Sequence, residues 1–269
     1  MVKLGGPLFG NYDDPSQWAS AVRAKGYRAA YCPVGADADS DTVAAYARAA
    51  ESAGVTIAEV GAWSNPLSPD SAVAEAATAH CIRQLALADR IGALCCVNIA
   101  GSRGEQWDGP HPENLTPETF DRIVEVVRTI IDAVRPTRTC YALETMPWMY
   151  PDSPESYLRL LKAIDRPAFG VHLDPVNLVC SPQRFFANGN LIRSCFAQLG
   201  PWIKSCHAKD ILLAPRLTTH LDEVRPGEGG LDYADFLTEL DRLNQTEQEY
   251  DLAADHIRTV AGKVGVIIE

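Results

Sequence analysis

The chain has 269 residues, 46% of them hydrophobic, and 24 Lys and Arg against 35 Asp and Glu give a net charge of −11. These values suit one large globular domain, which we expect to cover residues 1–269. The acidic balance, with no run of Lys or Arg, argues against a surface that follows nucleic-acid phosphates. No stretch reaches the roughly 18 apolar residues of a membrane span, and the N-terminus lacks the apolar run of a signal peptide. We therefore expect a cytoplasmic protein without a nucleic-acid or membrane partner, and leave open whether it forms a homo-oligomer.

The chain contains eight cysteines, and their placement argues against disulfides. Several lie inside apolar, strand-like runs, where a free thiol behaves as a small buried hydrophobe. No CxxC pair occurs, so neither a zinc ribbon nor a thioredoxin-like redox site is indicated. The sequence predicts reduced thiols, as in a cytosolic protein.

Strand and helix signals alternate along the chain. Short runs rich in apolar or β-branched residues predict strands at 3–9, 27–33, 55–61, 93–99, 139–144, 168–174 and 203–207. Helices are expected to begin near Pro15, Ser40, Asp70, Thr116 and Ser153, and to cover 190–199, 233–243 and 247–263. Thr116-Pro117 and Ser153-Pro154 place a capping side chain before a proline at the first helical position, which is a typical helix start.

This alternation predicts a parallel sheet, and eight helices favour a closed TIM (β/α)8-type barrel. The eighth strand is apparently missing or replaced. Only residues 244–246 separate the last two expected helices, and three polar residues cannot cross a barrel. The strand-like tail at 264–269 follows the last helix instead of preceding it.

Three of the predicted strands carry a metal-binding side chain at their C-terminal ends, namely Glu144, Asp174 and His207. Their spacing is about thirty residues, the length of one βα unit. Parallel barrel strands present their C-terminal ends at one mouth, so we expect these side chains to meet there. Carboxylate oxygens and an imidazole nitrogen suit Mn²⁺, Co²⁺, Mg²⁺ or Zn²⁺.

Four segments resemble the xylose-isomerase-like barrel superfamily of sugar-phosphate isomerases and ketose 3-epimerases, which is related to apurinic-endonuclease barrels. They read LETMPW at 143–148, HLDPVN at 172–177, CHAKD at 206–210 and RPGEGGLD at 225–232. The resemblance implies a divalent metal, Mn²⁺ foremost, held by Glu144, Asp174 and His207. A second metal-bound glutamate normally ends the eighth strand in this family. Here the fourth ligand is unknown, and Glu269 is a weak candidate for it.

A metal-dependent isomerase or epimerase of a small keto-sugar or polyol is the function that the resemblance implies. The metal polarises the sugar carbonyl, and a carboxylate removes the adjacent proton to give a metal-stabilised enediolate. Glu144 matches the first catalytic carboxylate. Without a matching second glutamate, the sequence puts two-base epimerisation in doubt, and activity could be impaired.

Other polar and aromatic residues follow the predicted strands and are candidates to contact the substrate. The candidates are His172, Lys209, Asp210, Trp148, Asn177 and Arg225. For each of them a structural role, such as packing or a rim ion pair, remains an alternative reading. Trp63, Trp107, Asn98 and the 101–104 turn are also expected near the mouth, whereas we interpret His111 as structural.

Other functions compete with this reading. Dehydration of an inosose uses the same enolisation. An endonuclease of abasic DNA needs more ligands and a basic groove, and Asn177 stands where some relatives carry a further His. A non-catalytic barrel that binds a sugar or a partner is the remaining alternative, favoured by the absence of a regular eighth strand.

Overall fold

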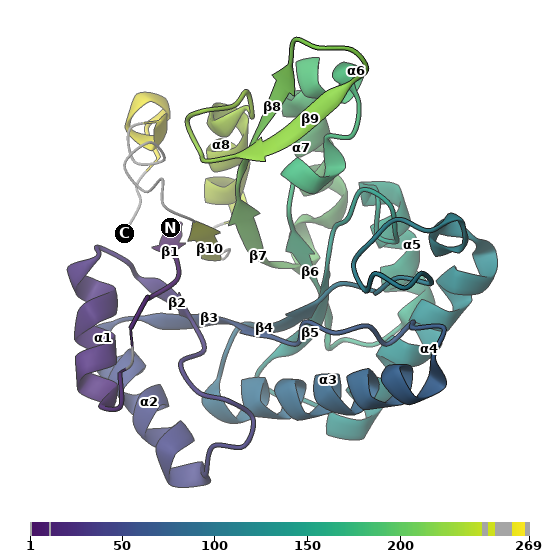
Figure 1. Ribbon diagram of the computed structural model, residues 1–269. Helices are drawn as coiled ribbons and strands as arrows, with labels where there is room; N and C mark the ends of the chain where they lie inside the picture. Colours follow the sequence, from purple (N-terminus) through teal and green to yellow (C-terminus); the bar gives the residue numbers. More distant parts are fainter. Residues whose placement is uncertain (1, 11, 244–246, 251–259, 267–269) are drawn as a thin grey trace.

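Eight parallel strands close into a barrel in the computed structural model of the protein, shown in Figure 1. The structure describes residues 2–10, 12–243, 247–250 and 260–266, and for 247–250 it gives the backbone alone. The strand order is β1-β10-β7-β6-β5-β4-β3-β2. The predicted TIM-type barrel is confirmed.

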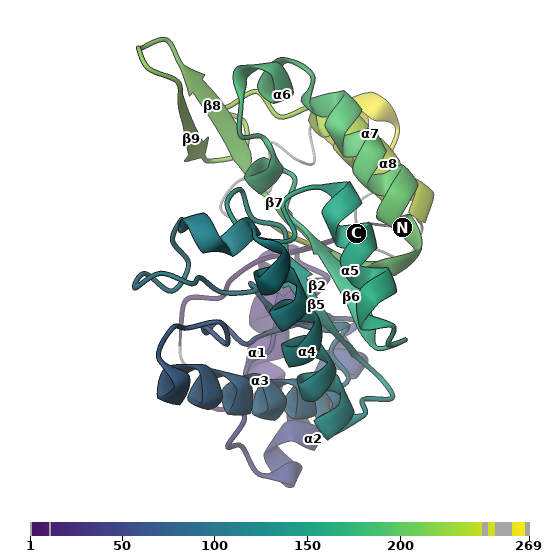
Figure 2. The same cartoon turned by 90° about the vertical axis from the view of Figure 1, so that its right-hand side faces the viewer.

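The predicted strands are all present, each within one to four residues of its expected ends. They are β1 Lys3–Gly5, β2 Ala29–Tyr31, β3 Thr56–Gly61, β4 Cys95–Asn98, β5 Cys140–Glu144, β6 Phe169–Leu173 and β7 Ile203–Ala208. The helices that follow them are α1 Pro15–Ala24, α2 Ser40–Ala53, α3 Ser71–Ile91, α4 Pro117–Val134, α5 Pro154–Ile164, α6 Pro182–Phe186, α7 Asn188–Leu199 and α8 Tyr233–Leu243. Figure 2 shows α3, α4 and α5 side by side on the outside of the sheet.

The helix boundaries follow from capping side chains. Thr116 accepts a hydrogen bond from the backbone N–H of Thr119, and Ser153 forms a reciprocal capping box with Ser156. Gly92 ends α3 in the left-handed conformation, with φ 77°, which a residue without a Cβ adopts at little cost. Local chemistry therefore explains why the helix starts could be predicted.

The regular apolar eighth strand is replaced by β10, Glu247–Tyr250, which pairs in parallel with β7 and β1. The prediction of a helix over 247–263 is therefore wrong for residues 247–250. Backbone N–H and C=O groups make a sheet, so a polar segment can pair with two open strand edges. Residues 260–264 are helical, so a strand does not begin at residue 264; residues 244–246 and Glu269 lie outside the described residues.

A β-hairpin that we did not predict follows β7. Its strands, β8 Asp210–Ala214 and β9 His220–Val224, pair antiparallel and project beyond the barrel (Figure 1). Gly229, just after β9, packs against the base of the hairpin, where a Cβ would lie 2.4 Å from both Asp210 Oδ1 and the carbonyl oxygen of Ile211. Only glycine allows this approach of backbone to carboxylate.

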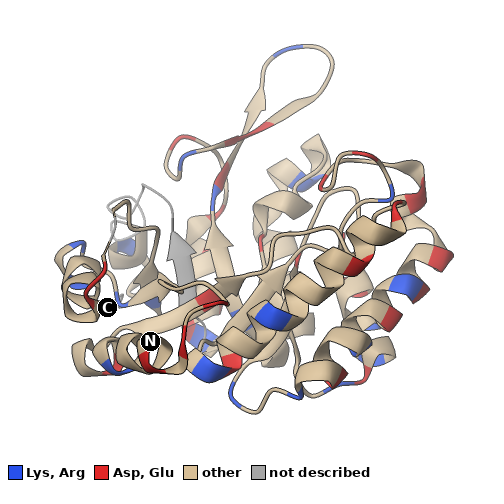
Figure 3. Cartoon of the chain, turned by 60° about the horizontal axis from the view of Figure 1, so that its bottom comes forward, with Lys and Arg blue, Asp and Glu red and all other residues tan. Residues whose placement is uncertain are grey.

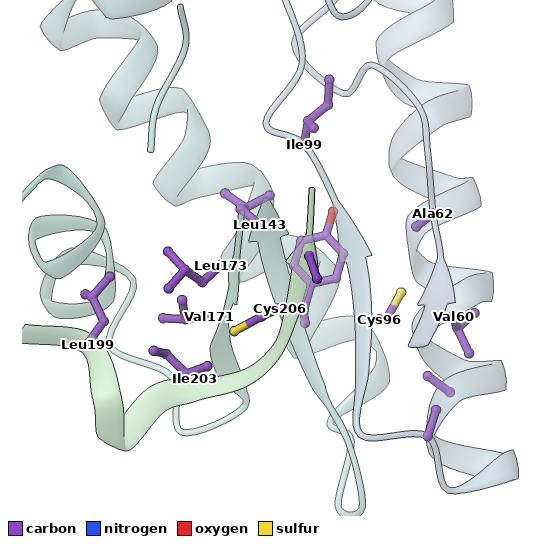
Figure 4. Close-up of a cluster of buried hydrophobic side chains, with 14 of the residues drawn as sticks. Val60, Ala62, Cys96, Ile99, Leu143, Val171, Leu173, Leu199, Ile203 and Cys206 are labelled. Atoms are coloured by element: carbon purple, nitrogen blue, oxygen red, sulfur yellow. The ribbon is translucent and has the colours of Figure 1, made fainter. Parts of the chain in front are cut away.

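The hydrophobic core has two parts. The larger one lies between the strands and the helices, and Figure 4 shows part of it, with side chains such as Leu143, Val171 and Cys206. A smaller cluster inside the barrel consists of Cys95, Val97, Cys140 and Ala142. These small side chains fill the barrel interior, and the polar side chains at the C-terminal ends of the strands lie at the barrel mouth. All eight cysteines are free, as predicted.

Basic and acidic residues are interspersed along the helices, as the colours of Figure 3 show. No helix among the described residues is long and apolar enough to cross a membrane.

Candidate metal centre

The three predicted ligands meet at the C-terminal ends of β5, β6 and β7. His207 Nδ1 lies 3.1 Å from Glu144 Oε1 and 3.7 Å from Asp174 Oδ2. One ligand atom from each of the three residues lies within 4.8 Å of the others. Glu144 and Asp174 are buried, and the His207 side chain is 14% exposed. The group is therefore compact and almost closed to solvent.

The side chain of Thr145, the residue after β5, holds the backbone of Asp174, the residue after β6. Thr145 Oγ1 donates a hydrogen bond to the Asp174 carbonyl and accepts one from the Asp174 N–H, at 2.7 and 3.0 Å. Asp174 Oδ1 accepts from the N–H groups of Val176 and Asn177 in the turn that follows β6. This leaves Oδ2 directed toward His207 and Lys209. The sequence HLDPVN thus positions one carboxylate oxygen and presents the other.

Lys209 and Asn177 supply the polar surroundings of the carboxylates. Lys209 Nζ lies 3.0 Å from Asp174 Oδ2 and 3.8 Å from Glu144 Oε1, and Asn177 Nδ2 donates to Glu144 Oε1 at 3.2 Å. Burial alone would raise the pKa of Asp174, but Lys209 and His207 outweigh it and hold that pKa below its usual range. Burial opposes the charge on Lys209, yet Asp174 and Glu144 raise its pKa. Both groups are therefore ionised at neutral pH.

A second polar group lies deeper in the barrel and shares His207. Glu59 on β3 and His172 on β6 are fully buried, and His172 Nδ1 lies 3.6 Å from Glu59 Oε2 and 2.5 Å from Ser205 Oγ. One ligand atom each from Glu59, His172 and His207 also lies within 4.8 Å of the others. Burial, followed by His207, lowers the pKa of His172 well below its usual value, so this imidazole is neutral.

Glu59 was missed in the sequence, although a carboxylate inside the apolar strand 55–61 is a signal that could have found it. A charged residue is almost never fully buried unless it has a partner.

The described residues fit a divalent cation. Two carboxylates and one imidazole are a hard, mixed oxygen and nitrogen donor set, which suits Mg²⁺, Mn²⁺ or Zn²⁺ and not a thiophilic metal. They lie at the mouth-side ends of adjacent parallel strands, where TIM barrels hold their reactive groups. None of the buried cysteines belongs to either ligand group of the described residues.

Asp210 begins β8 and Arg225 directly follows β9, and neither belongs to the two ligand groups of the described residues. Both Asp210 oxygens accept backbone N–H bonds, including those of Gly227 and Gly229 at 2.9 and 3.0 Å. Arg225 forms an exposed ion pair with Glu228. The predicted substrate contacts of these two residues stay predictions.

The predicted aromatic side chains lie in loops after β3, β4 and β5, each about two-fifths exposed. They are Trp63, Trp107 and Trp148. Trp148 Nε1 donates to the carbonyl of Asp108 at 2.7 Å, which attaches its loop to the one after β4. Asn98 bonds the backbone of Ser64 and so joins β4 to the β3 loop. His111 caps the 3-10 turn Pro112–Leu115 through Nδ1, a structural contact as expected.

Comparisons with known proteins agree with this architecture. The D-psicose 3-epimerase of Clostridium cellulolyticum H10, solved with D-tagatose, is 16% identical, with a TM-score of 0.66 over 95% of this chain and 89% of that one. A xylose isomerase-like TIM barrel protein from Mycobacterium smegmatis in complex with magnesium is 18% identical, with a TM-score of 0.65 over 98% and 94%. The probable 3-DHS dehydratase of petrobactin synthesis from Bacillus anthracis is 18% identical, with a TM-score of 0.68 over 98% and 97%.

At these identities the solved structures show a shared fold. The search of curated proteins gives no match. The family model for the xylose isomerase-like TIM barrel matches residues 19–247, which include all three predicted ligands. This protein therefore belongs to the xylose isomerase-like TIM barrel family.

Proposed function

We propose that the protein is a divalent-metal-dependent isomerase or epimerase that acts on a small keto-sugar or polyol. The observation that carries the proposal is the convergence of Glu144, Asp174 and His207 at the barrel mouth. The family supports it, and so do relatives of the same fold that are a sugar epimerase and a probable dehydratase. Mn²⁺ is the metal we expect, with Co²⁺, Mg²⁺ and Zn²⁺ as alternatives.

Glu144, Asp174 and His207 would hold the cation, which would polarise a substrate carbonyl and make the neighbouring C–H acidic. Glu144 is the proposed base. Its Oε1 accepts a hydrogen bond from Asn177, which restrains the orientation of the carboxylate, and lies 3.1 Å from Nδ1 of His207. The ammonium of Lys209 adds positive charge 3.8 Å from the same oxygen, where negative charge develops on the substrate.

Isomerisation is the reaction that Glu144 could carry out as a single base. Glu144 removes a proton from the carbon beside the carbonyl, and the electron pair moves to the carbonyl oxygen to form an enediolate. Glu144 then returns the proton to the former carbonyl carbon, and the hydroxyl proton of the neighbouring carbon passes to the former carbonyl oxygen, which gives the aldose or ketose isomer. Epimerisation at one carbon needs delivery from the opposite face, and so a second acid on the other side of the sugar. The proposed substrate contacts remain those named from the sequence, His172, Lys209, Asp210, Trp148, Asn177 and Arg225.

A second candidate is a non-catalytic barrel that binds a sugar. The shortness of β10, four residues in place of a full apolar strand, favours it. A glutamate is still present on this strand, because β10 holds Glu249 at the register position beside His207. The two candidates differ in one respect that is easily measured. A sugar-binding barrel catalyses no turnover, so no enzymatic activity would depend on the Glu144 carboxylate.

Ketoses, aldoses and their phosphates should be screened for conversion in the presence of Mn²⁺, with wild type compared with Glu144→Gln. We expect conversion by the wild type and a loss of about 10²- to 10⁴-fold in kcat for the variant, the usual contribution of a general base. Glu155→Gln, on the outer helix α5, is the matched control and should keep full activity. Full activity of Glu144→Gln would show that Glu144 is not the base. If the metal-loaded wild type converts none of the sugars, the result would favour the non-catalytic, sugar-binding barrel.

A further inference from the structure

Glu59 lies on the opposite side of His207 from the predicted metal ligands. Its Oε2 is 3.9 Å from His207 Nε2, whereas His207 Nδ1 faces Glu144 Oε1 at 3.1 Å. Glu59 comes from β3 and His207 from β7, so this approach crosses the interior of the barrel. The two ring nitrogens of one imidazole thus face two different acidic groups.

A neutral imidazole offers one lone pair and one N–H, so only one of its nitrogens can bind a cation while the other donates. Metal-binding histidines almost always donate the second ring N–H to a carboxylate, a carbonyl or water, which sets the tautomer and the ring orientation. Nδ1 lies beside Glu144 and Asp174, and Nε2 faces Glu59. Glu59, His207 and a cation beside Nδ1 would thus form a carboxylate–histidine–metal relay.

We propose that Glu59 is a positioning residue for the metal centre, which accepts the Nε2–H of His207 and so directs the Nδ1 lone pair toward Glu144 and Asp174. The inference rests on the proposed function, because it assumes a cation at those three ligands. The 3.9 Å between Nε2 and Oε2 exceeds hydrogen-bond length, so the proposal requires the two groups to come closer in the metal-bound protein. A cation on Nδ1 would draw charge from the ring and strengthen the Nε2–H as a donor.

The burial of Glu59 supports this assignment. A fully buried carboxylate is costly unless positive charge lies close to it. Lys209 lies beside Glu144 and Asp174, whereas Glu59 faces the Nε2 side of His207. A cation held by Nδ1 of His207 would place positive charge on the ring that Glu59 faces.

The test is the affinity of the metal-depleted protein for Mn²⁺, measured from the electron paramagnetic resonance signal of free Mn²⁺. We expect Glu59→Gln to bind Mn²⁺ about 10- to 100-fold more weakly than wild type, the usual effect of removing such a partner. Glu223→Gln is the matched control. It also removes one negative charge, 3.2 Å from Lys209 but more than half exposed, and should weaken binding less than about fivefold.

A second measurement separates positioning from general structural support. In the Zn²⁺-loaded protein, ¹⁵N chemical shifts should report His207 as the Nε2–H tautomer in wild type and a mixed population in Glu59→Gln. Glu59→Asp keeps the charge but withdraws the carboxylate from His207, so it should also bind Mn²⁺ more weakly. It serves as the test if Glu59→Gln does not fold. The melting temperature of each metal-free variant is recorded as the folding control.

The outcomes are distinguishable. If wild type binds no Mn²⁺, the proposed metal-dependent function fails. If wild type binds and both Glu59 variants bind equally well, the role of Glu59 fails while the proposed function stands. If Glu59→Gln and His172→Gln abolish binding and Glu144→Gln does not, the cation binds in the inner group of Glu59, His172 and His207, which overturns the positioning role.

Discussion

At the scale of single residues, the barrel mouth holds two kinds of imidazole. His207 lies between carboxylates, whereas His172 is fully buried and bonded to Ser205 through Nδ1. Their rings meet edge to face, with centroids 4.2 Å apart. Burial lowers the pKa of His172, and His207 adds to the effect. A neutral His172 is therefore part of the folded state.

This neutral imidazole predicts a pH dependence of stability in the metal-free protein. The unfolded chain takes up a proton on His172 below its ordinary pKa of about 6.5, while the folded protein does not. The stabilising contribution is present above that pH and is lost as the pH falls. Urea unfolding should show the free energy of unfolding decreasing from pH 7.5 to 5.5, with up to about 1.4 kcal/mol per pH unit from this residue. His172→Gln should flatten the slope, and an unchanged slope would assign it to other groups.

At the scale of elements, the loop after the β8–β9 hairpin depends on one buried carboxylate. Asp210 accepts backbone N–H bonds from Ile211, Gly227, Gly229 and Leu231 at 2.8 to 3.0 Å. These bonds attach the segment that leads into α8 to the start of β8. The motif CHAKD thus ends in a residue that shapes a loop beside the site.

Asp210→Asn should destabilise the protein by about 2–4 kcal/mol, because an amide cannot accept at both of its ends and leaves buried N–H groups unpaired. Chemical denaturation measures this loss. Asp222→Asn is the control, since Asp222 lies on β9 with its side chain 51% exposed, and it should change stability by less than about 0.5 kcal/mol. Equal stabilities for the two variants would contradict the role given to Asp210.

Local signals explain which elements could be predicted. Capping residues such as Thr116 and Ser153 act within one helical turn, so the sequence alone reveals them. The strand at Glu247–Tyr250 depends instead on the open edges of β7 and β1, which are distant in sequence. Its polar residues carry no strand pattern. The hairpin of β8 and β9 was not predicted because its strands pair with each other outside the barrel and bury only Asp210 and Ile211, which leaves a weak apolar pattern.

At the scale of the whole molecule, closure of the barrel decides which side chains meet. Glu144, Asp174 and His207 could be predicted because all three end strands, and strand ends share one mouth. Glu59 lies within β3, and its approach to His207 requires two strands on opposite sides of the barrel. A sequence pattern records position along a strand but not distance across a closed sheet. The proximity of Glu59 to His207 therefore could not be predicted from the sequence and is known only from the structure.

The central claim is that a divalent cation binds where β5, β6 and β7 end. Crystals soaked in Mn²⁺ and measured near the manganese absorption edge test it most directly. We predict one anomalous peak about 2.2 Å from Glu144, Asp174 and the Nδ1 atom of His207, and no such peak in crystals of Glu144→Gln combined with His207→Ala. A peak between Glu59 and His172, or no peak in the wild type, would contradict the claim.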